Sequence, residues 1–398
     1  MKRDITLFIV LLMAYSIGLD YHLCAQVSEC LKEVDELPVL NEVPSPFKTC
    51  SGEVIKTKND WLKRREEIKQ ILMFYEYGHM PPAPPISSVR LIKEADILES
   101  RGICKEFKVI YGPPEFEIDI MLFLPKDGFP PYPTILYIPK FWKENDDNLR
   151  IAEKCIKKNY VLCVFDKSML DDDSGSRDQK IYRIYPGYDW GSLAVWGWGA
   201  LRVLDFLETL PDVDTKHLAL TGHSRRGKAS LWASANDERI PLVIPQSSGT
   251  GGCGSYWIVG DGAETLKAIT TDVAPYWFVP RLKSFVGKEN RLPFDQHFLK
   301  ALIAPRGQLS RESLGDLWAN PKGTQAMHLY TVPVYELLNA ENNIYIHFRE
   351  GGHALQDTDW DLVLEFCDFY FFKKKPPSGL NSLPFSDIPT PSWMCQSN

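Results

Sequence analysis

Hydrophobic and polar residues alternate in the first part of the chain. CKEFKVIYG (104–112) and EFEIDIMLFLP (115–125) predict two strands that each have one buried face. Before them, WLKRREEIKQILMFYEYGHMPPAPP predicts a helix from Trp61 to about Tyr77, which the following prolines cannot continue. This part of the chain is therefore expected to place a helix ahead of two strands.

Short apolar runs replace this alternation from residue 133 onward. The runs are PTILYIP, YVLCVFD, HLALTGHS, LVIPQSS, LKALIAP and NIYIHFRE, and most are separated by helical stretches such as residues 192–210. Runs of this length between helices predict strands that are buried on both faces. The expected fold class is α/β, with a mostly parallel sheet covered on both sides.

The chain shows no linker, internal repeat or low-complexity tract, so one domain is expected from residue 26 to residue 398. Residues 251–295 are rich in glycine and aromatic residues and interrupt the alternation of strands and helices. We expect them to form a surface excursion over the ends of the strands.

Residues 1–25 have the pattern of a secretory signal peptide. Lys2 and Arg3 precede an apolar run from Thr6 to about Leu19, and Ala25 follows as a small residue for cleavage. The run is shorter than the roughly 20 residues that cross a bilayer, so a membrane anchor or a buried N-terminal segment is the weaker alternative. We expect an exported, soluble protein without a membrane span.

Composition places the chain among ordinary globular proteins, with 44% hydrophobic and 24% charged residues. A net charge of −7 argues against a nucleic-acid partner, because neutralising phosphates requires a basic face. Eight of the nine cysteines would remain after removal of the signal peptide, and an even number permits disulfides without fixing their pairing. No cysteine or histidine spacing indicates a zinc site, so no metal is expected.

Ser224 lies where a predicted strand, HLAL, meets a predicted helix, RRGKASLWASA. At such a turn the hydroxyl is exposed and the helix N-terminus favours developing negative charge. The second glycine of the motif, Gly227, falls one position later than in the G-x-S-x-G pattern of nucleophile elbows. Ser224 is the candidate nucleophile, and a serine that only caps the helix is the alternative.

A serine nucleophile needs a base to accept its proton, and the base needs an acid to orient it. His353 follows a predicted strand and two glycines, where a parallel sheet presents side chains to a site. It is the candidate base. His347 lies inside the strand and is expected to be structural, and His297 is a weaker alternative.

The acid of such a triad usually lies between nucleophile and base along the chain. We favour Asp316, which lies beside Gly315 in a predicted loop and has a short side chain that is held rigidly. Glu312 and Glu341 remain the alternatives.

The segment GHSRRGKAS is similar to the G-[CH]-S-R-x-G-K signature of glucuronoyl esterases, carbohydrate esterase family 15, bacterial type. The similarity covers roughly residues 60–360. It includes FYEYGHMPP, WGSLAVWGWGALRVLDFLETLPDVD, IPQSSGTGG, FDQHFLKALIAPR, DLWANPKG and EGGHAL in that order. The resemblance implies an α/β-hydrolase fold, a three-layer sandwich, and a reaction without cofactors.

The resemblance implies a secreted serine esterase that hydrolyses esters of 4-O-methyl-glucuronic acid, such as those joining glucuronoxylan to lignin alcohols. Ser224 would be the nucleophile, and Arg225 would contribute its guanidinium to the oxyanion hole. A fixed cation aimed at the developing oxyanion stabilises the transition state more than the ground state. Lys228, Glu264 and Trp318 would bind the sugar. A monomer is expected.

The chain departs from the family pattern at Ser247, where many members carry the acid of the triad as glutamate. Other members carry an acid two residues before a tryptophan, and Asp316 and Trp318 fit that arrangement. Residues 140–142, Lys-Phe-Trp, also differ from the forms expected beside the oxyanion hole. Arg226 is assigned no catalytic role and is expected to be solvated or ion-paired.

Two other functions remain open at this stage. The same scaffold could carry another carbohydrate esterase, such as an acetyl xylan esterase. Ser247 in place of the glutamate leaves room for a uronate-binding relative that does not hydrolyse its ligand.

Overall fold

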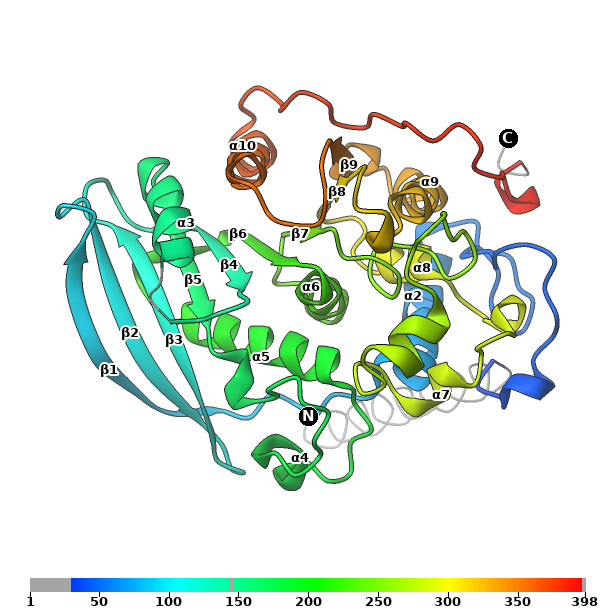
Figure 1. The fold of residues 1–398 in the computed structure, drawn as a ribbon, viewed down its shortest axis with the longest axis horizontal. Helices are drawn as coiled ribbons and strands as arrows, with labels where there is room; N and C mark the ends of the chain where they lie inside the picture. The colour runs from blue at the N-terminus through cyan, green and yellow to red at the C-terminus, as the bar shows by residue number, and fades with distance from the viewer. Residues whose placement is uncertain (1–29, 144–145, 396–398) are drawn as a thin grey trace, which may run out of the picture.

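A nine-stranded sheet forms the centre of the computed structural model, which describes residues 30–143 and 146–395 (Figure 1). The strand order is β1-β2-β3-β5-β4-β6-β7-β8-β9. The strands pair antiparallel from β1 to β5 and parallel from β5 to β9. Their bounds are β1 (Ile86–Ile97), β2 (Gly102–Tyr111), β3 (Phe116–Pro125), β4 (Tyr132–Ile138), β5 (Val161–Phe165), β6 (Val213–His223), β7 (Leu242–Gln246), β8 (Gly307–Ser313) and β9 (Ile344–Arg349).

Helices cover both faces of this sheet (Figure 1). On one face lie α3 (Asp146–Lys157) and α10 (Asp357–Phe372), whose apolar side chains share a core with β3 to β8. The larger core lies on the other face. Its helices are α2 (Lys58–Leu72), which continues as η2 (Met73–Tyr77), α5 (Ser192–Leu207), α6 (Arg225–Asn236), α7 (Pro280–Lys283), α8 (Gln296–Ala301) and α9 (Pro321–Leu337).

Shorter helical segments join these elements. They are η1 (Val34–Glu36), η3 (Lys167–Met169), α4 (Lys180–Ile184), η4 (Ala268–Asp272), η5 (Glu289–Arg291), η6 (Leu317–Ala319), η7 (Glu341–Asn343) and η8 (Ser392–Met394). Several of them lie in the loops that the next subsection describes.

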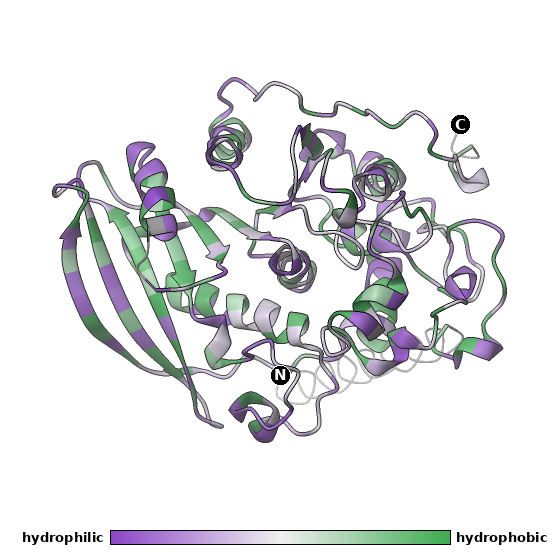
Figure 2. Ribbon diagram, in the orientation of Figure 1, coloured by the Kyte–Doolittle hydropathy of each residue, from purple (hydrophilic) through white to green (hydrophobic). Residues whose placement is uncertain are grey.

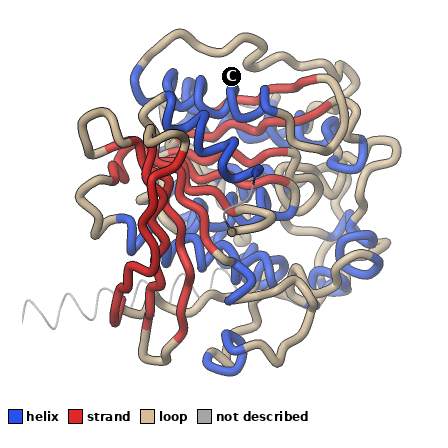
Figure 3. The backbone as a smooth tube through the Cα atoms, turned by 60° about the vertical axis from the view of Figure 1, so that its left-hand side comes forward, coloured by secondary structure: helices blue, strands red, loops and turns tan. Residues whose placement is uncertain are grey.

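The first three strands have 10 to 12 residues each and cross the direction of the distant strands (Figure 3). Neighbouring strands rotate by roughly 20–25° because of their right-handed twist, and the rotation accumulates over nine strands. Hydrophobic residues concentrate on the central strands and on α5, whereas β1 at the edge has a mixed pattern (Figure 2). Every residue of α5 except Asp205 is buried, which explains why its sequence is apolar on all sides.

Two predicted strands need correction. LKALIAP is not a strand: most of it lies in α8 and the turn that follows, and the neighbouring strand is β8. A short apolar run does not distinguish a buried strand from a buried helix. The prediction also missed β1, whose burial pattern does not alternate regularly.

The region 251–295 was expected to be a surface excursion, and the structure shows a packed subdomain of short helices and turns. Tyr256, Leu266, Phe278, Phe285 and Phe294 are all buried in the larger core. The aromatic residues that interrupt the strand and helix pattern therefore supply core contacts of their own.

Cys30 and Cys50 form a disulfide, whose pairing the sequence left open. No helix between residues 30 and 143 or between 146 and 395 is long and apolar enough to span a bilayer. The predicted signal peptide lies outside the described residues.

Candidate active site

Ser224 occupies the sharp turn between β6 and α6, with φ 59° and ψ −132°. A non-glycine residue at positive φ is strained and is held by its surroundings. Here the Ser224 amide donates to the carbonyl of Gln246 at 2.8 Å. A Cβ atom on Gly222 would lie 2.4 Å from the carbonyl oxygen of Arg226, so only glycine permits the helix to start this close to the strand. These features make the predicted nucleophile elbow, despite the displaced second glycine.

His353 and Asp316 meet although they come from different loops. The Nδ1 atom of His353 lies 2.6 Å from Oδ2 of Asp316, and the Asp316 side chain is buried. The loop after β8 and the loop after β9 are tied together where the Gly315 amide donates to the Gly351 carbonyl at 2.9 Å. A carboxylate only accepts, so Nδ1 of His353 carries a proton and Nε2 is left to act as a base.

His223 is a member of the site that the sequence analysis missed. Its Nε2 lies 2.8 Å from the carbonyl oxygen of His353, and the two rings are 4.4 Å apart between centroids. Burial, followed by the charge of His353, lowers the pKa of His223 to about 3, so the ring is neutral near pH 7. His223 could have been identified from the sequence, because it directly precedes Ser224 at the end of a buried strand.

Arg225 is the first residue of α6 and its guanidinium has a fixed position. Its Nη1 donates to the carboxylate of Asp173, and its Cζ lies 4.8 Å from the ring centroid of Trp277. The indole of Trp277 in turn donates to Asp173 at 3.0 Å. Asp173 belongs to an acidic run after β5, and sequence analysis assigned it no role. The structure therefore places Arg225 beside Ser224, with its charge partly offset by Asp173.

Ser224, Arg225 and His353 line one hollow of about 630 Å³, which we call the nucleophile pocket. Its other walls come from the end of β4, from α3, and from the loop before α10. They include Tyr137, Lys140, Asp147, Arg150, Ile151, His223, Arg226, Ala354, Leu355 and Trp360. The hollow lies outside the carboxyl ends of parallel strands, where α/β sheets bind their ligands.

Lys228, one helical turn after Ser224, forms a buried ion pair with Glu264. Their charged atoms are 2.8 Å apart, and Lys228 also donates to the Thr250 carbonyl. A Cβ on Gly249, whose φ is +70°, would lie 1.8 Å from Oε1 of Glu264, so this approach requires glycine. Burial raises the pKa of Glu264, and the nearby ammonium opposes that change.

Trp318 is 47% exposed. Its backbone carbonyl accepts a hydrogen bond from the Glu264 amide at 3.0 Å, which joins it to the ion pair. The three predicted sugar-binding residues thus lie in one region. Lys228, at 1% exposure, is set beneath the surface rather than on it. Its direct contact with a sugar hydroxyl stays a prediction.

The alternatives to the chosen triad residues lie elsewhere or are neutral. Glu312 is buried within β8, its carboxylate oxygens have no partner among the described residues, and burial raises its pKa far above the usual range. Glu341 is exposed at the opposite end of the sheet, before β9. His297 is buried in α8 and its Nε2 contacts the Pro44 carbonyl. None of them occupies the nucleophile pocket.

Ser247, the departure from the family pattern, is buried at the end of β7 with φ 43°. Its hydroxyl oxygen lies 3.3 Å from Nη1 of Arg311, whose other nitrogen pairs with Asp359. Arg311 thus already has a carboxylate partner from α10. The position where the family resemblance implied an acid carries an uncharged side chain here.

Comparison with known proteins decides the family. A family model described as "Glucuronyl esterase, fungi" matches residues 115–339. A 4-O-methyl-glucuronoyl methylesterase from Thermothelomyces thermophilus is 31% identical, with 87% of this chain and 86% of that protein covered. The chain belongs to the glucuronoyl esterase family.

Solved structures agree with this assignment to the glucuronoyl esterase family. A carbohydrate esterase family 15 glucuronoyl esterase from Caldicellulosiruptor kristjansonii has a TM-score of 0.74 and 29% identity, covering 89% of this chain and 96% of that one. A glucuronoyl esterase variant from Sporotrichum thermophile in complex with methyl 4-O-methyl-β-D-glucopyranuronate has a TM-score of 0.69 and 28% identity, covering 86% and 91%. The predicted α/β-hydrolase fold is confirmed.

Some glucuronoyl esterases are longer than this chain. It spans 64% of the 4-O-methyl-glucuronoyl methylesterase of Podospora anserina and 65% of that of Cerrena unicolor. The predicted family is confirmed, and the roles of the individual site residues stay predictions.

Proposed function

We propose that this member of the glucuronoyl esterase family hydrolyses esters of 4-O-methyl-glucuronic acid through Ser224, His353 and Asp316. The observation that carries the proposal is the 2.6 Å contact between His353 Nδ1 and Asp316 Oδ2, beside a serine on a strained strand-to-helix turn. Such a constellation is recognised by geometry and roles rather than by sequence position.

The reaction begins when Ser224 attacks the ester carbonyl and His353 Nε2 accepts its proton. His353 then protonates the departing alcohol oxygen as the acyl–oxygen bond breaks. Water repeats the sequence on the acyl-enzyme and releases the free uronic acid. Asp316 stabilises the positively charged imidazole in each half-reaction without itself taking the proton.

Arg225 stabilises the oxyanion. As the first residue of α6, it offers a backbone N–H that has no partner within the helix. The ion pair with Asp173 and the face of Trp277 support a fixed position for its guanidinium. A donor held in advance does not have to reorganise when charge develops, and loss of one such donor costs about 3 kcal/mol in the barrier.

The sugar lies over Lys228, Glu264 and Trp318. The half-exposed indole of Trp318 offers an apolar face to a pyranose ring. Lys228 fixes the carboxylate of Glu264 through the buried ion pair, and Glu264 accepts hydrogen bonds from the sugar hydroxyls.

We also propose that residues 26–398 are one catalytic domain of an exported monomer acting on glucuronoxylan esters. The disulfide between Cys30 and Cys50 supports an oxidising compartment, because such bonds persist mainly outside the cytosol.

Hydrolysis of methyl 4-O-methyl-glucuronate, followed by the appearance of the free acid, tests the reaction. The wild type is expected to release acid, and Ser224→Ala is expected to lose turnover while keeping its thermal unfolding curve. Activity on acetylated xylan in place of the methyl uronate would indicate an acetyl esterase. Binding of the uronate without turnover by the wild type would indicate a relative that does not hydrolyse its ligand.

A further inference from the structure

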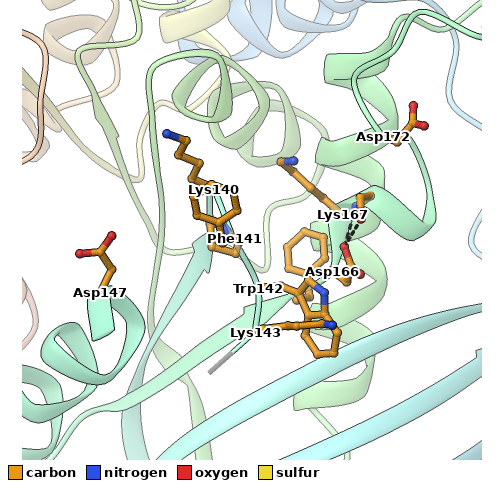
Figure 4. A pocket seen from close by; sticks show the side chains of 11 residues that line it. Lys140, Phe141, Trp142, Lys143, Asp147, Asp166, Lys167 and Asp172 are labelled. Carbon is orange, nitrogen blue, oxygen red and sulfur yellow. Dashed lines mark hydrogen bonds between the residues drawn. The ribbon is translucent and has the colours of Figure 1, made fainter. Parts of the chain in front are cut away.

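A second hollow adjoins the nucleophile pocket. It measures about 870 Å³, lies between the loops after β4 and β5, and shares Lys140 and Asp147 with the nucleophile pocket. We call it the lysine pocket (Figure 4). Lys228, Glu264 and Trp318 line neither hollow. The sugar-binding residues of the proposed function and the lysine pocket are therefore separate parts of the surface.

Three cations around these hollows have no carboxylate partner among the described residues: Lys140, Lys167 and Arg226. The nitrogen atoms of Lys140 and Lys167 rest on rings instead, 5.1 Å from Phe141 and 4.4 Å from Trp196. The Nε atom of Arg226 is buried with no hydrogen-bond partner. The Arg226 side chain is partly exposed in the wall of the nucleophile pocket, and its expected solvation stays a prediction. An anion bound here would pair with cations that have no carboxylate partner of their own, and hydrogen bonds from lysine or arginine to a carboxylate are among the stronger ones.

The carboxylates that face the two hollows are already engaged. Asp147 lies 3.3 Å from Arg150, and Asp166 accepts from the amide of Ser168 at 3.0 Å. Asp173, which lines neither hollow, pairs with Arg225. In Figure 4, Lys140 and Lys167 lie between Asp147 at one end and Asp172 at the other.

Asp172 itself accepts from the Ser174 amide at 3.1 Å. Burial, followed by the charge of Arg226, lowers the pKa of Lys167, as expected where cations lie close together. Asp166 and Asp172 keep their charge, but the lining of the two hollows together is positive. It has three carboxylates, Asp147, Asp166 and Asp172, and six cations, Lys140, Lys143, Arg150, Lys167, Arg225 and Arg226.

The walls of the lysine pocket also carry aromatic surface. Phe141 is 61% exposed, and Trp142 lines the hollow beside it. An aromatic ring gains from stacking on such side chains, and a carboxylate gains from hydrogen bonds to lysine and arginine.

We propose that the lysine pocket binds the alcohol portion of the ester and selects aromatic alcohols that carry a carboxylate. The proposal rests on the proposed function, which puts the sugar over Lys228 and Glu264 and leaves this side for the leaving group. The reaction itself is unchanged: the acyl–oxygen bond breaks, His353 protonates the alcohol oxygen, and the pendant carboxylate stays intact.

Two synthetic esters of 4-O-methyl-glucuronic acid test the selection, the benzyl ester and the 4-carboxybenzyl ester. The wild type is expected to show kcat/KM about ten-fold higher for the carboxylated ester, since hydrogen bonds to charged groups contribute the most. Lys167→Met and Arg226→Gln are expected to bring the ratio towards one. Because the two esters are compared within each variant, a change in folding or in Ser224 chemistry does not move the ratio.

Lys216→Met is the matched control, since it also removes one positive charge but lies near the start of β6, at the other end of the sheet from Ser224. Its ratio is expected to equal that of the wild type. Raising the ionic strength is expected to reduce the wild-type ratio by screening. A wild-type ratio of one, or a ratio that neither pocket variant changes, would overturn the proposal.

Binding of the alcohols alone separates this proposal from the proposed function. Ser224→Ala protein is titrated with 4-(hydroxymethyl)benzoate and with benzyl alcohol, and binding is followed by NMR. Preference for the carboxylated alcohol supports the pocket even if no uronate ester is hydrolysed. Equal binding of the two alcohols contradicts the pocket even if the methyl ester is hydrolysed.

Discussion

The ammonium group of Lys228 lies 2.8 Å from a carboxylate oxygen of Glu264, in a pair whose side chains are almost fully buried. Breaking such a pair leaves one buried charge uncompensated, which typically costs 3–5 kcal/mol. Lys228→Met is therefore expected to lower the free energy of unfolding by about 3 kcal/mol in urea and to raise KM for the methyl uronate.

The double variant Lys228→Met/Glu264→Gln separates stability from binding. It removes both charges, so most of the lost stability is expected to return while KM stays high. A single variant that unfolds within about 0.5 kcal/mol of the wild type would show that the pair does not hold this region together.

His223 is expected to act as a positioning residue for His353. His223→Ala removes the N–H that donates to the His353 carbonyl, and we expect kcat to fall roughly ten-fold with little change in KM. His223→Gln keeps an amide N–H at a similar distance from the backbone and is expected to recover most of kcat. Equal activity of His223→Ala and the wild type would argue that the contact only packs the core.

Glu76 makes the stability depend on pH. Its Oε1 accepts from Tyr256 and Gln296 at 2.7 Å, and burial raises its pKa from 4.5 to about 8. The folded state therefore keeps a proton that the unfolded state loses above pH 4.5. This contribution to stability is complete below pH 4.5 and is lost as the pH rises through 8.

The matched variant is Glu76→Gln, which cannot ionise. The wild type is expected to lose stability relative to this variant between pH 5 and about pH 8, as measured by urea unfolding at each pH. A constant difference across that range would mean that Glu76 does not titrate with a raised pKa.

The disulfide between Cys30 and Cys50 closes a short loop, with a sequence separation of 20 between the two cysteines. A loop of this length restricts the unfolded chain by an entropy worth about 3 kcal/mol. The double variant Cys30→Ala/Cys50→Ala is expected to lose about that much free energy of unfolding. The wild type with its disulfide reduced is expected to have the same free energy of unfolding as this double variant. No change on reduction would contradict a stabilising role.

The proposed catalytic side chains are easier to find in the sequence than the strand beside them. Ser224 and His353 are marked by local signals, a strand-to-helix junction and a pair of glycines after a strand. In contrast, β8 is polar in sequence although all seven of its residues are buried. Its polar groups bind partners that are distant along the chain, such as Asp359 for Arg311. The hydropathy of the strand does not predict those contacts.

Contacts between distant residues also explain why the sequence analysis missed other features of the structure. Nothing local marks Asp173 as the partner of Arg225 or Cys50 as the partner of Cys30. Asp316 was identified among three acids by its loop setting and by the tryptophan two positions later. The contact of Asp316 with His353 depends on two loops that only the folded sheet brings together.

The value of kcat for Asp316→Asn on methyl 4-O-methyl-glucuronate tests the account most directly. An amide at this position carries no negative charge to stabilise the positively charged imidazole, so kcat is expected to fall about 10⁴-fold with the fold intact. Glu312→Gln, a change of the buried neutral acid in the neighbouring strand, is the control and should keep most of the activity. If Asp316→Asn turns over within about ten-fold of the wild type, another group orients His353 and the proposed triad is wrong.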